Sequence, residues 1–264
     1  MGRDGMRVVV TGAAGRIGRV VSDGLVGLGH EVVGVDQVSA DGIKRVDVSD
    51  SEALRPLLNR AQAVVHLAGY AGEGSLQTAL HTHVHTTHAV LEAMRLERVP
   101  RIVYASSAHA VGFTPSDGAL GVDVRPRPDT FYGLGKVAAE AMCSLYADRY
   151  GLAAACMRIG AFLERPLTRR HLAIWLSHGD AVRLVEACLT APDLSYAVVY
   201  GISANTRAWW DLEPGRALGY HPQDDGERFA TDILAKPETE RDVFDAKHVG
   251  GSFCATDLRA PHPR

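Results

Sequence analysis

A tyrosine and a lysine stand four residues apart in the stretch "FYGLGKVAAE", at Tyr132 and Lys136. On a helix, residues i and i+4 share a face, so the ammonium of Lys136 would lie beside the phenol of Tyr132. A nearby positive charge lowers the pKa of a phenol, which would make the pair a general base near neutral pH. The same spacing also occurs where an aromatic residue packs in the core and its lysine faces solvent. Other motifs must therefore decide between the two interpretations.

A glycine-rich turn follows the first apolar run, in "RVVVTGAAGRIGRVV", and contains Gly12, Gly15 and Gly18. Glycines let the backbone approach a pyrophosphate, whose charge is favoured by the free N–H groups at a helix N-terminus. The second apolar run ends in Asp36, whose carboxylate would accept from ribose hydroxyl groups and repel a 2′-phosphate. Gln37 follows it, where an arginine would favour a phosphate. The pattern predicts NAD rather than NADP.

The third apolar run ends in "RVDVSD", which contains Asp47 and Val48. These two residues are candidate partners for the edge of the adenine ring. An acid at this place would equally suit the N-terminus of the helix that follows. The sequence leaves both roles for Asp47 open.

Short apolar runs alternate with longer amphipathic stretches through the first 160 residues, which predicts a Rossmann-type, doubly wound parallel α/β sheet. We expect strands near 7–10, 31–35, 44–46, 63–67, 101–104 and 153–158, and helices near 16–28, 51–59, 75–98 and 130–150. Residues 1–160 would form the NAD-binding part. Residues 161–264 would form a small substrate-binding cap packed on it, with a loop at 164–166, a helix at 180–189 and a strand at 196–200.

The overall composition favours a small-molecule partner. The chain has 264 residues and a formal net charge of −3, without long basic runs, which argues against nucleic acid or an anionic membrane surface as partner. No signal-peptide pattern or stretch of 18 apolar residues is present, so we expect a cytoplasmic protein. The scattered residues Cys143, Cys156, Cys188 and Cys254 predict neither disulfides nor a zinc site.

Two further strand ends carry polar residues, in "HLAG" (66–69) and "YASSAH" (104–109), and Ser107 there is placed to donate to a substrate oxygen. The order of the glycine motif, this serine and the Tyr132/Lys136 pair resembles the extended branch of the short-chain dehydrogenase/reductase superfamily. The segments "RPDTFYGLGKVAAE", "MRIGAF", "WLSHGDAVRLVEA", "VVYGISAN", "WWD" and "GGSF" resemble the uronate dehydrogenase family within it, across nearly the whole chain.

The resemblance implies a reaction and a role for each matching residue. Tyr132 would take the proton of the anomeric hydroxyl of a cyclic hexuronic acid while hydride leaves C1 for NAD, which gives an aldarolactone. Lys136 would hold the nicotinamide ribose and lower the pKa of Tyr132, Ser107 would bind the reacting oxygen, and His109 would contact the sugar. Arg170 would hold the substrate carboxylate, unless it is a surface arginine like its neighbour Arg169. The implied cofactor-binding residues are Gly12, Gly15, Arg16, Ile17, Gly18, Asp36, Asp47, Val48, Leu67, Ala68, Gly69, Tyr132, Lys136 and Ile159.

The sequence departs from the family pattern in two respects. Ala71, Ala108 and Ala161 stand where the family has small polar residues, so the preferred substrate need not be galacturonate or glucuronate. His83 stands where the superfamily has an asparagine that supports the catalytic lysine through water. An imidazole there could relay protons, but its charge near neutral pH would matter.

The stretch "LHTHVHTTHA" places His81, His85 and His88 at helical spacing. No carboxylate completes a usual metal site, and the helix should lie against the cofactor. We expect no native metal site there.

Three functions compete at this point. The first is an NAD-dependent dehydrogenase of a uronic acid or related sugar. The second is a nucleotide-sugar epimerase or dehydratase that keeps its NAD bound, although such enzymes usually have a longer C-terminal region. The third is an NAD-sensing protein without turnover, which would have no need of Ser107, Tyr132 and Lys136 together. The resemblance also implies a homo-oligomer.

Overall fold

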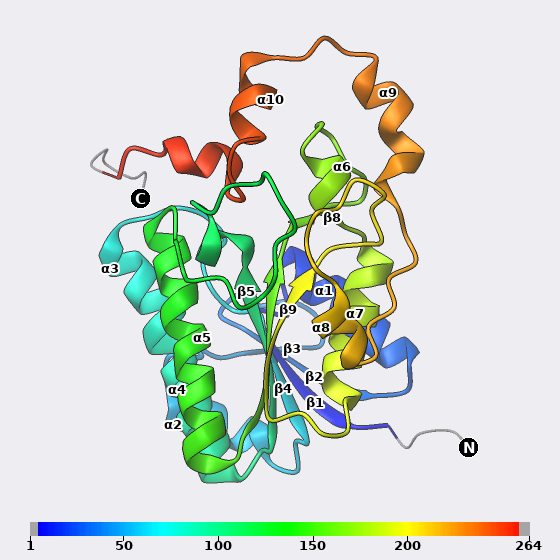
Figure 1. The fold of residues 1–264 in the computed structure, drawn as a ribbon. Coiled ribbons are helices and arrows are strands. Elements are labelled where there is room, and N and C mark those ends of the chain that lie inside the picture. Colours follow the sequence, from blue (N-terminus) through cyan, green and yellow to red (C-terminus); the bar gives the residue numbers. More distant parts are fainter. Residues whose placement is uncertain (1–4, 259–264) are drawn as a thin grey trace.

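The computed structural model describes residues 5–258 and is built around one seven-stranded sheet (Figure 1). The strands run parallel in the order β3-β2-β1-β4-β5-β6-β9. Their bounds are β1 (Arg7–Thr11), β2 (Glu31–Asp36), β3 (Ile43–Arg45), β4 (Ala63–His66), β5 (Arg101–Ser107), β6 (Ala153–Ile159) and β9 (Tyr196–Gly201). The order reverses beside β1, which confirms the predicted doubly wound α/β fold.

Alternate residues of the strands supply two hydrophobic cores, one on each face of the sheet. In β1, Val8 and Val10 enter one core, and Val9 enters the other. Helices α1 (Arg16–Gly27) and α7 (His178–Thr190) cover the first face, and α4 (Thr86–Glu97) and α5 (Phe131–Tyr150) cover the second (Figure 1). Each fully buried valine contributes about 1.5–3 kcal/mol, so burial on both faces holds the strand ends in register.

Two of the predicted helices are interrupted. The segment expected at 51–59 is α2 (Ser51–Leu54) followed by a 3₁₀ turn, η1 (Arg55–Leu58), because Pro56 has no N–H to continue the α-helical pattern. The segment expected at 75–98 is α3 (Leu76–Ala79), a π-helix η2 (Leu80–His85) and α4. Within it, the Thr82 and Thr86 hydroxyls bond the carbonyl groups four residues earlier.

Helix α5, which carries Tyr132 and Lys136, has well-defined ends. The hydroxyl of Thr130 caps its first turn by accepting from the Gly133 N–H at 3.1 Å. Gly151 ends it in the left-handed conformation, with φ 68°.

The C-terminal region adds short elements, most of which lie above the carboxyl ends of the strands, whereas α8 (Glu213–Ala217) packs against β9 (Figure 1). These elements are β7 (Ala161–Phe162), α6 (His171–Ile174), β8 (Trp175–Leu176), α8 (Glu213–Ala217), the 3₁₀ turn η4 (Gly226–Phe229), α9 (Ala230–Leu234), α10 (Glu240–Asp245) and the 3₁₀ turn η5 (Gly251–Ala255). Residues 246–255, here called the strap, return to the sheet. The N–H groups of Val249 and Gly250 donate to the carbonyl oxygens of Thr114 and Gly112, both at 2.9 Å.

No helix within residues 5–258 is long and apolar enough to cross a membrane. All four cysteines are free thiols.

Candidate active site

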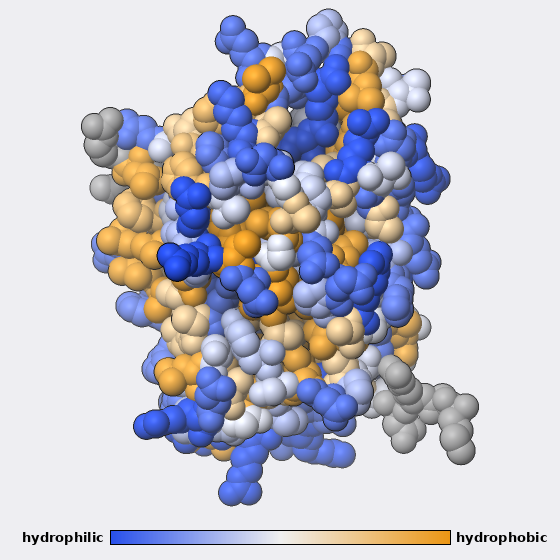
Figure 2. All heavy atoms as spheres, viewed as in Figure 1, coloured by the Kyte–Doolittle hydropathy of each residue, from blue (hydrophilic) through white to orange (hydrophobic). Residues whose placement is uncertain are grey.

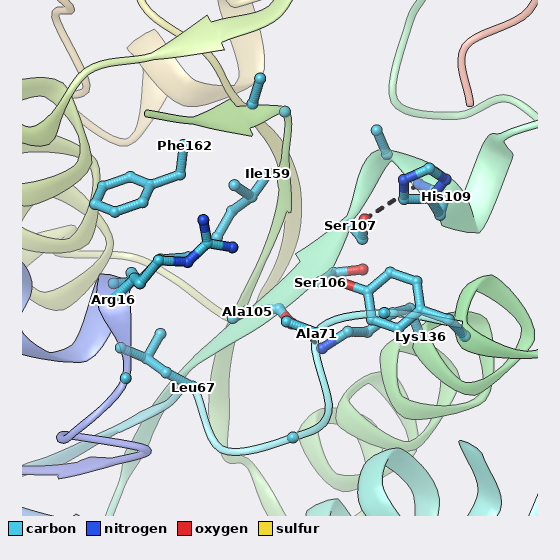
Figure 3. A pocket seen from close by; sticks show the side chains of 18 of the residues that line it. Arg16, Leu67, Ala71, Ala105, Ser106, Ser107, His109, Lys136, Ile159 and Phe162 are labelled. Carbon is cyan, nitrogen blue, oxygen red and sulfur yellow. Dashed lines mark hydrogen bonds between the residues drawn. The ribbon is translucent and has the colours of Figure 1, made fainter. Parts of the chain in front are cut away.

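A cavity of about 480 Å³ lies at the carboxyl ends of the strands. Figure 3 shows Ser107, His109 and Lys136 on one side of it, and Arg16, Ile159 and Phe162 on the other. The predicted residues that line it are Gly12, Gly15, Arg16, Ile17, Gly18, Leu67, Gly69, Ala71, His83, Ser107, Ala108, His109, Tyr132, Lys136, Ile159, Ala161 and Arg170. A second hollow, of about 360 Å³, shares Gly12, Gly15, Leu67 and Gly69 with the first. It adds the predicted residues Asp36, Asp47, Val48 and Ala68.

The glycine turn fits a dinucleotide phosphate closely. Gly12 has φ 71°, and a Cβ there would lie 2.7 Å from the backbone nitrogen of Ala68. A Cβ on Gly18 would lie 2.1 Å from the Gly12 carbonyl oxygen, so larger residues would force the turn open. The turn therefore presents bare backbone to the ligand space, as the phosphates of NAD require.

Asp36 is held in place at the end of β2. Its two carboxylate oxygens accept from the N–H groups of Ala14 and Val38, each at 3.0 Å. Asp47 accepts from the N–H and the hydroxyl of Ser49, which lowers its pKa, and Asp50 rather than Asp47 caps α2. Asp47 thus shapes a turn at the rim of the second hollow, where a ligand can reach it.

Lys136 and Tyr132 share one face of α5, as predicted from their spacing. The Lys136 Nζ lies 5.5 Å from the centre of the Tyr132 ring and donates to the Ala105 carbonyl oxygen at 2.7 Å. Burial lowers the pKa of Lys136 to about 7, although the carboxylate of Glu140 one turn further raises it in part.

The expectation that Lys136 lowers the pKa of Tyr132 is not met in the protein alone. Burial raises the pKa of Tyr132, and a hydrogen bond with Ser107 offsets this only partly. The cause is desolvation, which disfavours the phenolate and the ammonium alike. In the protein alone, the protonated phenol of Tyr132 is therefore favoured.

His83 lies against the same tyrosine, with ring centres 5.1 Å apart. It is 2% exposed and its Nδ1 has no partner among the described residues. Burial, with the charge of Lys136 second, lowers the pKa of His83 to about 3. The imidazole is therefore neutral at physiological pH, which answers the question of its charge that the sequence left open.

Ser107 and His109 stand at the end of β5, and His109 has a buried partner that the sequence did not reveal. The Ser107 Oγ accepts from the His109 N–H at 3.2 Å (Figure 3). The His109 Nδ1 lies 2.7 Å from the Asp129 carboxylate, whose side chain has no exposed surface. A carboxylate only accepts, so Nδ1 carries the proton and Nε2 is left for a ligand.

Arg170 is a cavity residue, whereas Arg169 is the arginine that binds the carbonyl groups of Leu234 and Lys236 outside the cavity. Arg170 donates to the Val249 carbonyl oxygen of the strap, and no described residue forms an ion pair with it. Burial lowers its pKa, and Asp245 raises it in part. A half-buried guanidinium without a carboxylate partner is a natural site for an anionic group.

The strap also supplies Phe253, another site residue that the sequence did not indicate. Its ring packs on His109 with ring centres 4.2 Å apart. Asp129 and Phe253 are distant in sequence from the strand ends, and only the folded chain brings them to His109. The motif "RPDTFYG" and the terminal "GGSF" were the available signals for these two residues.

The histidines of "LHTHVHTTHA" do not converge. The rings of His81 and His85 lie 6.3 Å apart, and no group of three possible metal ligands is found within residues 5–258. His83 and His81 line different hollows instead.

Comparison with known proteins adds independent findings. Residues 8–163 match the family described as NAD dependent epimerase/dehydratase. The chain is 34% identical to the uronate dehydrogenase of Pseudomonas putida, over 94% of this chain and 95% of that protein. It is 35% identical to the L-arabinose 1-dehydrogenase (NAD(P)(+)) of Haloferax volcanii, over 83% of this chain and 96% of that one. A crystal structure of a mutant uronate dehydrogenase from Agrobacterium tumefaciens complexed with NAD matches with a TM-score of 0.90 at 33% identity, covering 96% of this chain and 98% of that chain.

Proposed function

Because the chain belongs to the NAD dependent epimerase/dehydratase family, we propose that it is an NAD-dependent dehydrogenase that oxidises C1 of a hexuronic acid. The observation that carries the proposal is Arg170, a half-buried cation without an ionic partner among the described residues, in the cavity that also holds Ser107, Tyr132 and Lys136. One cavity thus offers a base and an anion site. A sugar that is oxidised at one end and carries a carboxylate at the other matches both.

We propose a role for each of these residues. Ser107 donates to the oxygen on C1, and Tyr132 accepts the proton of that hydroxyl. Lys136, whose Nζ donates to the Ala105 carbonyl oxygen, would hold the nicotinamide ribose. NAD, when bound, supplies the hydride acceptor and a positive charge beside the phenol. The C1–H bond breaks as hydride leaves, the O–H proton goes to Tyr132, and the sugar becomes a lactone.

The cofactor is NAD rather than NADP. The Asp36 carboxylate is fixed by two backbone N–H groups and carries a negative charge to the place of the adenosine ribose. A 2′-phosphate there would meet that charge, whereas a ribose diol would donate to it.

The test is turnover with a panel of sugars. Purified protein with NAD⁺ is given hexuronic acids and the neutral hexoses of matching ring stereochemistry, and NADH is followed by absorbance while NMR identifies the product. NADH with a lactone product from an acid sugar supports the proposal. An isomerised sugar without NADH, or binding of NAD without any turnover, rejects it in favour of an epimerase or a sensor.

A neutral aldose is the second candidate substrate. The relative from Haloferax volcanii is named for a neutral sugar, and Ala71, Ala108 and Ala161 give this cavity apolar walls. In the same panel, a higher kcat/KM for the neutral hexoses than for the acids would favour this candidate.

We also propose that residues 161–264 supply much of the substrate-binding region, while β9 and α7 within them complete the central sheet and its cover. We further propose that the enzyme is a homo-oligomer in the cytoplasm. Leu134, Leu145 and Tyr150 on α5 are 40%, 56% and 55% exposed, which supports self-association. Figure 2 shows hydrophobic side chains gathered on the side of the molecule where α3 and α5 lie in Figure 1. Light scattering measures the oligomeric state of the wild-type protein and of Leu145→Glu. If both proteins are monomeric, the proposed homo-oligomer is rejected.

A further inference from the structure

His171 lines the same cavity and directly follows Arg170 in the chain. Its ring is fixed by the loop before α6. The Leu167 N–H donates to the His171 Nδ1 at 3.2 Å, and the His171 N–H donates to the Thr168 hydroxyl at 3.2 Å. These two bonds hold both the backbone and the ring of His171, so its orientation does not depend on a ligand.

The bond from Leu167 also decides the tautomer of His171. An Nδ1 that accepts a backbone N–H carries no proton, so the proton of a neutral imidazole is on Nε2. Burial lowers the pKa of His171 to about 4, with the charge of Arg170 as the second cause, and Asp245 raises it in part. The ring is therefore neutral at physiological pH and its Nε2–H can only donate. Within residues 5–258, nothing accepts from this Nε2.

We propose that His171 is a second hydrogen-bond donor to the carboxylate of the substrate, beside Arg170. The inference deepens the proposed function and rests on it. A carboxylate accepts hydrogen bonds through two oxygens. One N–H group of Arg170 already donates to the Val249 carbonyl oxygen, so fewer of its donors remain for the substrate. A neutral donor at its side adds a bond to the acid without the cost of burying a second cation.

Asp245 lies near Arg170 and His171 but forms no ion pair with either of them. From the end of α10, it acts on both residues through space. Its own ion pair is with Arg241, at 3.7 Å. The donors of Arg170 and His171 therefore stay available to a ligand in the cavity.

Three substitutions distinguish the role of the His171 Nε2–H as a donor from the role of Nδ1, which accepts from the Leu167 N–H. His171→Leu removes both ring nitrogens. His171→Asn places an amide oxygen near Nδ1, where it can accept from the Leu167 N–H, but it brings no donor to the position of Nε2. His171→Gln places an amide N–H near Nε2. His221→Leu serves as the matched control, because His221 is exposed and borders a separate hollow between α7 and α8.

The expected result is a rise in KM for the hexuronic acid of about tenfold in His171→Leu and His171→Asn, which is the loss of one hydrogen bond to a charged group. His171→Gln should return KM to within about threefold of wild type. The His171 variants should keep the wild-type KM for neutral hexoses and the wild-type affinity for NAD. His221→Leu should keep the wild-type KM for the hexuronic acid. Calorimetry on the NAD-loaded protein with a 1,5-anhydrohexuronate, which lacks the C1 hydroxyl, should reproduce the same order of affinities without turnover.

Two results would overturn the inference and leave the proposed function intact. One is equal KM and affinity in wild type and His171→Leu. The other is rescue by His171→Asn and not by His171→Gln, which would mean that His171 acts only through the loop. Wild-type protein that oxidises no acid sugar would instead reject the proposed function itself.

Discussion

Tyr132 combines two properties that oppose each other. Its phenol lines the cavity, where a ligand can reach it, and its partial burial raises its pKa. Ser107, Lys136 and His83 surround it, yet only Ser107 lowers that pKa in the protein alone. The positive charge of a bound cofactor would lower this pKa, so we expect the base strength of Tyr132 to depend on cofactor binding.

Tyr132→Phe tests the base directly. The ring and its packing against His83 and His109 remain, and only the proton acceptor is lost. We expect turnover to fall by about 10²–10⁴-fold, because that is the usual contribution of a general base. NAD affinity, measured by calorimetry, should stay within about twofold, because packing is retained. A phenylalanine variant with wild-type kcat would show that another group takes the proton.

Asp129→Asn tests the partner of His109. The amide has the size of the carboxylate, which matters because a Cβ on Gly112 or Gly250 would already overlap the Asp129 carboxylate. It can present an N–H to His109 Nδ1, which would favour the wrong tautomer. We expect kcat/KM for the uronate to fall by about 10–100-fold, as for other partners that orient a functional histidine. NAD affinity should not change.

The matched control for this variant is Asp50→Asn. Asp50 caps α2 by accepting from the Ala53 N–H at 3.0 Å, and asparagine caps equally well. Both variants remove one negative charge. If they reduced kcat/KM equally, the effect would come from the net charge and not from the orientation of His109.

At the scale of elements, the strap packs against two residues of the proposed substrate site, Arg170 and His109. Gly251 has φ 59°, and a Cβ on it would lie 2.8 Å from the Arg170 Nε. The neighbouring Val249 carbonyl oxygen accepts from Arg170, and Phe253 packs on His109. The position of the strap therefore determines where the anion site and His109 lie.

Gly251→Ala should raise KM for the uronate several-fold, because Arg170 must move away from the new methyl group. Gly219→Ala is the control for backbone strain alone, since Gly219 has φ 94° and no atom within 4 Å of an added Cβ. Each variant should lose about 1–2 kcal/mol of unfolding free energy from the left-handed conformation. Only Gly251→Ala should change KM, and an unchanged value would remove the strap from substrate recognition.

The strands of the sheet were predictable because each signal was local. Apolar runs of the right length marked β1, β2, β4, β5 and β6, and the strand-end rule placed Asp36 and Ser107 at the ligand edge. The short elements after β6 were not predictable, because four- and five-residue helices such as α6 and α9 pack on segments distant in sequence. Asp129 was missed for the same reason, because its contact with His109 exists only in the folded chain. His171 was missed because no motif marked it, although its hydrogen-bond partners Leu167 and Thr168 are close in sequence.

On the scale of the whole molecule, the ionisation of Lys136 links the site to folding stability. Burial lowers the pKa of Lys136 to about 7 in the folded protein. In the unfolded chain a lysine has a pKa of about 10.4. Between these two values the unfolded chain binds more protons than the folded protein, so the contribution of Lys136 to the unfolding free energy rises with pH. Below the pKa of Lys136 in the folded protein, both the folded protein and the unfolded chain carry the proton. The contribution of Lys136 to the unfolding free energy then stays at its least favourable value.

Lys136→Met removes this titration and keeps an unbranched side chain in the same space. The unfolding free energy of wild type minus that of Lys136→Met should therefore increase by up to about 4 kcal/mol between about pH 7 and about pH 10. Urea unfolding of the cofactor-free proteins at several pH values measures this difference, and titrations common to both proteins cancel in it. A difference that stays constant or falls with pH would mean that Lys136 remains fully charged in the fold, and Glu140, rather than desolvation, would then govern its ionisation.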